Sequence, residues 1–247
     1  MASIAVIGAG LSGLTLAREL SEKHEVTIFE KSRGAGGRMS TRRAEPWFFD
    51  HGAQYFQAKT PRFQAFIKPM IDAGLIAPWF ARVAQIAEST VVGKDVWTDD
   101  DPRFVGVPGM NAVAKYLAQD LTVQADTRVA MIQPSDGWTL FDEAAQSLGD
   151  FDWVVCAIPS DQAKELLPPN FSGFKRLQQV EMRANYTAML GCEEPITLGF
   201  DAAQVTGSDV GWMAVNSAKP SRPGEYSLVI QSTPEFAAKH IDGDRAW

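Results

Sequence analysis

The chain is poor in the residues that form disulfides and bind metals. It has 2 cysteines, Cys156 and Cys192, and 3 histidines, which are scattered along the 247 residues. Cys156 falls in the apolar run 153–158, which is typical of a buried strand. Such spacing matches no zinc-binding pattern. We therefore expect no structural disulfide, no metal site and a reducing compartment.

Positive charge and long apolar runs are also scarce. The chain has 23 Lys and Arg against 30 Asp and Glu, a net charge of −7 and a pI of about 5.0. A nucleic acid would have to bind against this field, so we exclude it as a partner. No run approaches the roughly 20 apolar residues that span a bilayer, and no signal peptide is recognisable. We expect a cytoplasmic protein with no membrane partner.

A nucleotide-binding pattern is present at the N-terminus. The apolar run 3–7 predicts a buried parallel strand, and Gly8, Gly10 and Gly13 follow it directly. Leucines at helical spacing and a second β-rich run, 25–30, complete a strand–helix–strand unit. The first glycine permits a tight turn, the second lets backbone approach a pyrophosphate, and the third lets the helix pack on the strand. The alternative is that the glycines serve only the turn.

Glu30 ends the second strand, where its carboxylate can accept hydrogen bonds from both hydroxyls of a ribose. A 2′-phosphate would be repelled there, so FAD and NAD are favoured over NADP. Four arginines, Arg33, Arg38, Arg42 and Arg43, follow within eleven residues of this acidic chain. That concentration indicates a bound dianion, although an ordinary solvated basic loop is the alternative.

Elsewhere the pattern is less specific. It predicts helix over most of 61–80, short strands over 87–108 around a turn at 93–95, and a meander near residues 123–125, 129–132 and 138–141. Later strands are expected at 186–192, 211–215 and 227–232.

Together these motifs resemble the amine-oxidase-like flavoproteins. The resemblance rests on the glycine turn, Glu30, the run Gly36-Gly37-Arg38 and the segment 50–55, of which Gly-Ala-Gln-Tyr is similar to the renalase branch in particular. It continues at 104–110, 156–159, 216–219 and 228–233, and so covers nearly the whole chain.

The resemblance implies an α/β fold in which a Rossmann-like FAD-binding domain of the GR2/p-hydroxybenzoate-hydroxylase type is interleaved with an α+β substrate domain. We expect residues 1–60 and 106–160 to form the FAD-binding lobe and 61–105 and 161–235 the substrate lobe. The family continues with a Gly-Asp-containing segment and a helix that close over the flavin, so 236–247 is expected to be a truncated C-terminal segment.

The resemblance also implies which residues contact the ligands. The predicted FAD contacts are Gly8, Ala9, Gly10, Ser12, Gly13, Glu30, Lys31, Gly37, Arg38, Gln54, Tyr55 and Val129, the last through its backbone. The candidate substrate contacts are Arg42, Trp97, Tyr186 and Trp212, although most aromatic side chains at this density are core residues. No catalytic side chain is assigned, because hydride transfer to a flavin requires no base; His51 is a candidate base or a supporting residue.

The implied reaction is an FAD-dependent oxidation of a small dinucleotide. In it, 2- or 6-dihydro isomers of NAD(P)H become NAD(P)+ by hydride transfer to the flavin, and O2 is reduced to H2O2. A flavin amine oxidase and a non-catalytic FAD-binding module remain alternatives. An apolar cavity with an aromatic pair would favour an amine, and a mixed polar cavity near Arg42 would favour a dinucleotide.

Overall fold

The computed structural model describes residues 1–243 and divides into two compact units. The first unit contains Met1–Arg38 and Ala114–Met182, and the second contains Met39–Val113 and the chain from Arg183 onward. These bounds differ from the expected lobes, because residues 39–60 and 106–113 belong to the second unit and 161–182 to the first. The assignment of FAD and substrate to separate lobes stays a proposal.

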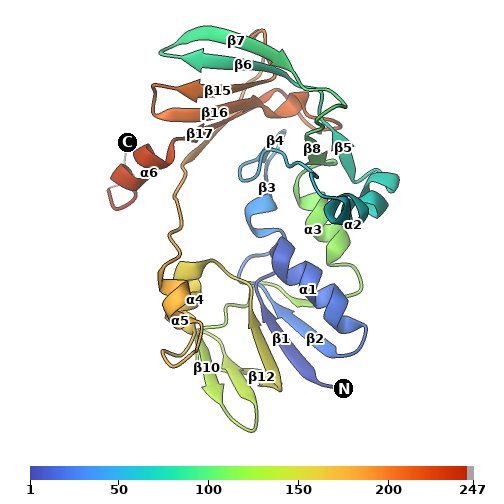
Figure 1. Cartoon of the computed structure of the whole chain (residues 1–247), viewed down its shortest axis with the longest axis vertical. Coiled ribbons are helices and arrows are strands. Elements are labelled where there is room, and N and C mark those ends of the chain that lie inside the picture. The colour runs from blue at the N-terminus through green and yellow to red at the C-terminus, as the bar shows by residue number, and fades with distance from the viewer. Residues whose placement is uncertain (244–247) are drawn as a thin grey trace. The chain divides into compact units, whose positions relative to one another are not determined.

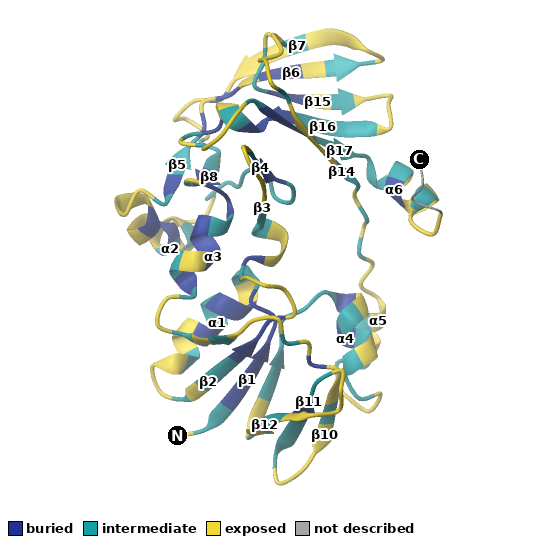
Figure 2. Cartoon of the chain, turned by 180° about the vertical axis from the view of Figure 1, so that it is seen from behind, coloured by how far each residue is buried: buried dark blue, intermediate teal, exposed yellow. Residues whose placement is uncertain are grey.

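The first unit contains a parallel sheet with the strand order β13-β1-β2-β9 (Figure 1). Its strands are β1 (Ser3–Ile7), β2 (Glu25–Phe29), β9 (Thr122–Gln124) and β13 (Trp153–Cys156). Helix α1 (Leu11–Ser21) connects β1 to β2. Strand β1 is almost entirely buried, as Figure 2 shows, because it lies between two strands and beneath α1. This is the strand–helix–strand unit that the sequence predicts.

A second, antiparallel sheet completes the first unit. It contains β10 (Met131–Pro134), β11 (Trp138–Phe141) and β12 (Ser147–Phe151). Short helices α4 (Ser160–Leu166) and α5 (Phe174–Gln178) follow. Ala5, Ile7, Phe29, Val129 and Leu140 pack together in one buried cluster, which joins the two sheets of this unit.

The second unit is built on a mixed sheet with the order β14-β17-β16-β15-β6-β7. Its strands are β6 (Arg82–Ala87), β7 (Thr90–Val96), β14 (Thr187–Gly191), β15 (Ala202–Thr206), β16 (Val210–Val215) and β17 (Ser227–Ser232). The unit also contains the hairpin of β3 (Thr41–Ala44) and β4 (Trp47–Asp50), the pair β5 (Ile76–Pro78) and β8 (Phe104–Gly106), α2 (Pro61–Asp72), η2 (Asn216–Ala218) and α6 (Pro234–His240). Helix α3 (Asn111–Leu117) carries the chain back to the first unit, and η1 (Gly37–Met39) lies where the chain first leaves it.

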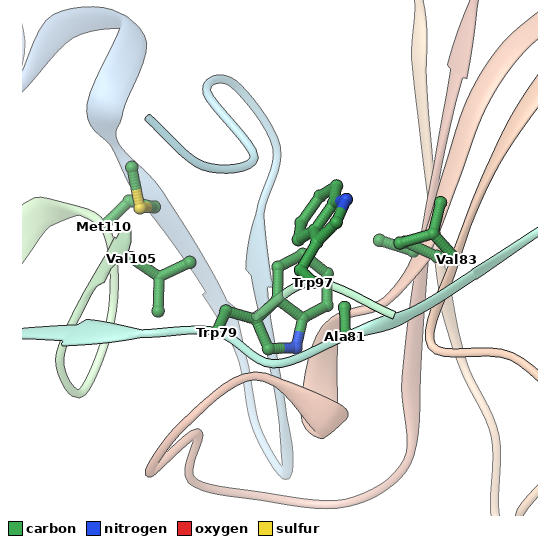
Figure 3. Packing of buried hydrophobic residues seen from close by; sticks show 8 residues of the cluster. Trp79, Ala81, Val83, Trp97, Val105 and Met110 are labelled. Carbon is green, nitrogen blue, oxygen red and sulfur yellow. The ribbon is translucent and has the colours of Figure 1, made fainter. Parts of the chain in front are cut away.

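A tryptophan pair forms the centre of the core of the second unit. Trp79 and Trp97 meet edge to face, with ring centroids 5.4 Å apart. Figure 3 shows the two indoles between Val105 and Met110 on one side and Val83 on the other. Edge-to-face contact is a favoured arrangement of aromatic rings, so this cluster fixes β5, β6 and β8 together.

Two local expectations are wrong, and a third, the helix, holds for only part of its range. The turn between β6 and β7 lies at Glu88 and Ser89, both with positive φ, and not at 93–95, which lies within β7. The helix over 61–80 ends at Asp72, beyond which β5 begins. The meander does not include residues 122–124, because β9 pairs in parallel with β2.

Two further features concern the chain as a whole. Within residues 1–243, no helix combines the length and apolar character needed to cross a membrane. Of the expected truncated segment 236–247, residues 236–243 are described and include most of α6, whereas 244–247 lie outside the described residues.

Candidate functional site

The predicted ligand contacts fall in both units, and each unit is described by itself. The first unit contains the glycine turn with Ala9 and Ser12, then Glu30, Lys31, Gly37, Arg38 and Val129. The second contains Arg42, His51, Gln54, Tyr55, Trp97, Tyr186 and Trp212. No bound molecule tests these contacts, so they stay predictions.

Three glycines shape the turn between β1 and α1, each for a different reason. Gly8 has a φ of +104°, and a Cβ on it would lie 2.9 Å from the carbonyl oxygen of Ala157. A Cβ on Gly13 would lie 2.0 Å from the carbonyl oxygen of Gly8, so helix and strand could not pack as they do. A Cβ on Gly10 would meet no described heavy atom within 4 Å. The turn therefore requires two glycines for its own fold and leaves space at the third.

The space at Gly10 lies at the N-terminus of α1. Gly10 is the N-cap, and in the described structure no side chain caps this helix end and no acidic residue lies in its first turn. The first N–H groups of a helix lack partners within the helix, and its dipole favours anions there. Open space, free donors and a positive helix end together suit a pyrophosphate.

The Glu30 carboxylate is buried beside this turn. Its Oε2 accepts a hydrogen bond from the Ala9 N–H at 2.9 Å, and its Oε1 accepts one from the Ser32 N–H at 2.8 Å. Each carboxylate oxygen has a second lone pair, so the group can still accept hydrogen bonds from ribose hydroxyls. Glu30 therefore orients the turn as well as being available to a ligand.

The glycine-rich segment after Glu30 packs against the same turn. The Gly36 N–H donates to the Ala9 carbonyl oxygen at 2.9 Å, and Gly37, at a φ of +52°, approaches Gly10 closely. Lys31 donates from Nζ to Oε1 of Gln162 at 3.1 Å. The Arg38 side chain is exposed, as is Ser12. This segment therefore brings Gly36 and Gly37 beside Ala9 and Gly10 at the N-terminus of α1.

Val129 is a core residue by its side chain. It is 7% exposed and packs in the cluster with Phe29 and Leu140. Its side chain is part of the core, and a contact of its backbone with a ligand stays a prediction. The residues of the first unit therefore fit the adenosine and pyrophosphate part of FAD: an open glycine, a free helix end and a carboxylate.

A buried ionic cluster dominates the site residues of the second unit, and its centre is Asp50 at the end of β4. Asp50 Oδ2 accepts from Arg222 Nη2 at 2.5 Å, from Arg222 Nε at 2.9 Å and from Lys219 Nζ at 3.3 Å. Its Oδ1 accepts from the Thr41 hydroxyl at 2.8 Å and from the Met110 N–H at 3.0 Å. The side chains of Asp50, Lys219 and Arg222 are fully buried. The cluster thus contains two cations and one anion.

The pKa values of this cluster reflect burial and pairing. Burial alone would raise the pKa of Asp50, but the charges of Lys219 and Arg222 and two hydrogen bonds outweigh it and lower the value. Burial lowers the pKa of Lys219 to about 8, even though Asp50 acts in the opposite direction. Keeping Lys219 charged in the folded protein therefore costs free energy of desolvation.

The loop after Asp50 is tied to this cluster and to the sheet. Gln54 Oε1 accepts from Lys219 Nζ at 3.1 Å, and Gln54 Nε2 donates to the carbonyl oxygens of Asp50 at 2.5 Å and Gly52 at 3.2 Å. Thr187 Oγ1 donates to the carbonyl oxygen of His51 at 3.0 Å. The motif at 50–55 therefore has a defined backbone conformation.

His51 is half-buried in this loop, and its Nε2 lies 3.1 Å from the Ser40 hydroxyl. Burial, followed by the charge of Arg42, lowers the pKa of His51, although Asp50 opposes the shift. A histidine with a lowered pKa is neutral at pH 7. His51 is thus in the state a base requires, but no substrate atom places it in that role.

The aromatic candidates lie together. The Tyr55 ring is 4.7 Å from the Trp97 ring and 5.7 Å from the Trp212 ring, measured between centroids. Trp97 and Trp212 are nearly parallel, with their centroids 6.2 Å apart. Trp97 is only 7% exposed, so it belongs to the core as much as to any site.

The other two substrate candidates also belong to the second unit. Arg42 is exposed on β3, in register with Phe49 of β4. Tyr186 precedes β14, and its hydroxyl donates to the carbonyl oxygen of His240 at 3.0 Å. Tyr186 therefore anchors α6.

Sequence reasoning did not identify the ionic cluster. Asp50 and Lys219 lie within segments that carry the family resemblance, but their pairing joins residues 169 positions apart. No motif in the sequence indicates a role for Arg222. The neighbouring Asn216, fully buried, accepts from the Asp50 N–H at 3.2 Å, and it lies in the segment 216–219 that carries the resemblance.

Two family models match the chain. The model of the NAD(P)-binding Rossmann-like domain matches residues 6–69, and that of the flavin containing amine oxidoreductases matches residues 73–241. Among curated proteins, 4,4'-diapophytoene desaturase of Staphylococcus aureus strain Newman is 52% identical over 50 residues, which are 20% of this chain and 10% of that protein. The match thus spans about a tenth of the length of this relative.

Solved structures with the same fold cover most of the chain. A putative protoporphyrinogen oxidase from Exiguobacterium has a TM-score of 0.69 at 12% identity, over 97% of this chain and 81% of the other. An engineered putrescine oxidase has a TM-score of 0.73 at 13% identity, over 99% and 78%. An oxidoreductase from Methanosarcina mazei has a TM-score of 0.68 at 14% identity, over 97% and 81%. At these identities the likeness shows the fold alone.

Proposed function

Because this chain belongs to the flavin containing amine oxidoreductases, we propose that it is an FAD-dependent oxidase of dihydronicotinamide dinucleotides, as the likeness to the renalase branch suggests. The donors would be 2- or 6-dihydro isomers of NAD(P)H, oxidised to NAD(P)+ while O2 is reduced to H2O2.

The family match confirms three of the expectations from the sequence. They are the α/β fold with a Rossmann-like domain, FAD as the cofactor and the class of FAD-dependent oxidoreductases. The renalase branch, the donor, oxygen as the acceptor and a cytoplasmic location are parts of the proposal.

The observation that carries the choice of donor is the positive charge around the 50–55 loop. Asp50 is outnumbered by Lys219 and Arg222, and the charge of Arg42 adds to the effect of burial in lowering the pKa of His51. A dinucleotide carries an anionic pyrophosphate, whereas most amines are cations at neutral pH. Like charges repel and opposite charges attract, so this field favours a dinucleotide.

The residues of the chain would bind and orient the ligands, whereas FAD, when bound, would supply the redox chemistry of hydride and electron transfer. Gly10 and the N-terminus of α1 would hold the pyrophosphate of FAD, and Glu30 its ribose. Gln54 and Tyr55 would contact FAD from the 50–55 loop. Arg42 would attract the phosphates of the donor.

One observation favours the flavin amine oxidase as a second candidate. Tyr55, Trp97 and Trp212 bring aromatic faces together, and such faces attract ammonium groups. The putrescine oxidase with the same fold acts, by its name, on an amine. The charge of the loop opposes this candidate and the aromatic cluster supports it, so an experiment on donors decides between them.

The test is anaerobic mixing of the flavin-loaded protein with each donor while the flavin absorption is followed. The dihydronicotinamide proposal expects bleaching by 2- or 6-dihydro-NAD and none by putrescine. In a matched pair of variants, Arg42→Gln should raise the KM for the dinucleotide about tenfold, and Arg62→Gln, an exposed arginine on α2, should not. Bleaching by the amine alone would favour the second candidate. Flavin bands that persist with every donor would leave a non-catalytic FAD-binding module.

A further inference from the structure

We propose that Lys219 is a positioning residue, which fixes the second half of the 50–55 loop by orienting the side-chain amide of Gln54. The inference rests on the proposed function in one respect, namely that this loop contacts FAD. Its structural part concerns the chain alone.

The Lys219 ammonium has only internal partners. Its side chain is fully buried, and Nζ donates to Asp50 Oδ2 at 3.3 Å and to Gln54 Oε1 at 3.1 Å. The ammonium also lies 5.5 Å from the centre of the Trp79 ring. The two hydrogen bonds and the aromatic ring thus direct the ammonium at the loop and the core.

Lys219 selects one of the two orientations of the Gln54 amide. With Oε1 toward the ammonium, Nε2 donates to the carbonyl oxygens of Asp50 and Gly52. In the flipped orientation the NH2 group would face the ammonium, and Oε1 would face two carbonyl oxygens. Each of those contacts is repulsive, so a buried amide next to this cation has a single stable orientation.

The two halves of the loop have different supports. The carbonyl oxygens of His51 and Gly52 accept hydrogen bonds from Gln231 Nε2 at 3.3 and 2.8 Å, and His51 also accepts one from Thr187. These donors belong to the sheet and do not involve Lys219. The segment from Ala53 to Tyr55 follows the Gln54 amide, which Lys219 holds from its Oε1 side, and its apolar side chains pack against the core. Loss of Lys219 should therefore loosen 53–55 and leave 51–52 in place.

The need to neutralise Asp50 does not by itself explain why Lys219 is buried beside it. Arg222 contacts Asp50 Oδ2 through both Nε and Nη2, so this arginine already neutralises the carboxylate. A second buried cation adds a desolvation cost, which its lowered pKa records. The hydrogen bond that Lys219 makes and Arg222 does not is the one to Gln54.

The test compares Lys219→Met with Ser227→Ala in the whole chain. Ser227 is 1% exposed and donates to the Phe48 carbonyl oxygen, so its removal also costs a buried hydrogen bond in the same unit but spares the loop. Hydrogen exchange of the backbone amides is measured in both variants without FAD, and the Kd for FAD is measured by titration of the apoprotein. In Lys219→Met we expect exchange at 53–55 to rise about tenfold and the Kd to rise about tenfold, with neither change in Ser227→Ala.

Each outcome has a distinct meaning. Unchanged exchange at 53–55, or an equal rise throughout the second unit in both variants, would overturn the positioning role. A loosened loop with unaltered FAD binding would support that role and overturn the placement of the loop against the flavin. Wild-type protein that binds no FAD would overturn that placement, and the exchange at 53–55 would still decide the positioning role. If Lys219→Met does not fold, Gln54→Leu, which keeps the ion pairs, must show the same faster exchange at 53–55, and its failure to do so would overturn the inference.

Discussion

Separate replacement of two glycines in the nucleotide-binding turn should separate cofactor binding from folding. Gly10 has a φ of −75°, which alanine adopts freely, and a Cβ there meets no described atom within 4 Å. Gly10→Ala should therefore change the free energy of unfolding of the apoprotein by less than about 1 kcal/mol. The same methyl group occupies the space proposed for the pyrophosphate, so the Kd for FAD should rise at least about tenfold, or about 1.4 kcal/mol.

Gly13→Ala should have the opposite profile. Its Cβ would lie 2.0 Å from the Gly8 carbonyl oxygen, about 1 Å closer than real Cβ contacts come, and the obstacle is backbone. Helix α1 would have to move away from β1, the most buried strand of the first unit. We expect a loss of about 3 kcal/mol of stability or more, as for other overpacked sites.

The assay is urea unfolding of both apoproteins together with titration by FAD, followed through the flavin fluorescence. If Gly10→Ala is destabilised as much as Gly13→Ala, the space at Gly10 does not exist in the folded protein. If Gly10→Ala binds FAD like the wild type, the pyrophosphate does not lie at this turn, and the placement of FAD is refuted.

Three further predictions concern buried charges. Burial lowers the pKa of Lys219 to about 8, below the 10.5 of free lysine, so between these values the unfolded chain holds more protons and stability rises with pH. The free energy of unfolding of wild type minus that of Lys219→Met should thus rise by about 3 kcal/mol, mostly between about pH 8 and pH 10.5. A flat difference in urea titrations would contradict this. Asp50→Asn should cost about 3–5 kcal/mol of stability at pH 7, because it leaves two buried cations unpaired. Since the pKa of Asp50 is lowered in the folded protein, calorimetry should find that the wild type loses this advantage only below about pH 4. Glu30→Gln should cost about 1–3 kcal/mol, because an NH2 group would face the N–H of Ala9 or Ser32, and chemical unfolding that shows no loss would count against those hydrogen bonds.

The parts of the fold that the sequence predicts are those fixed by local chemistry. Strand β1, helix α1 and strand β2 are signalled within thirty residues by an apolar run, spaced glycines and a second β-rich run. The strands at 210–215 and 227–232 are likewise predicted to within one residue, because β-rich composition and burial agree there. Local preference and tertiary structure point the same way in these segments.

The β6–β7 turn shows why other segments escape prediction. Glycine usually marks a turn, yet Glu88 and Ser89 adopt positive φ, while Gly93 lies inside β7. A Cβ on Gly93 would lie 3.1 Å from Gln85 Oε1, so this glycine makes room for a side chain of the neighbouring strand. That reason is visible only when the pairing of the two strands is known. The parallel pairing of β9 was not predicted for the same reason, since its partner β2 lies almost a hundred residues earlier in the chain.

The two groups of site residues differ in how they are encoded, and this decides which part of the function can be inferred. The FAD contacts predicted in the first unit are mostly backbone groups, which glycines at fixed spacing expose, so a short motif is enough to predict them. The buried ionic cluster of the second unit is made by side chains that meet only in the folded chain, since Asp50 and Arg222 are 172 residues apart. No motif encodes such a meeting. The cofactor is therefore predictable from sequence, whereas the proposed donor rests on a charge balance that the sequence does not show, so the variants proposed to distinguish donors change the second unit.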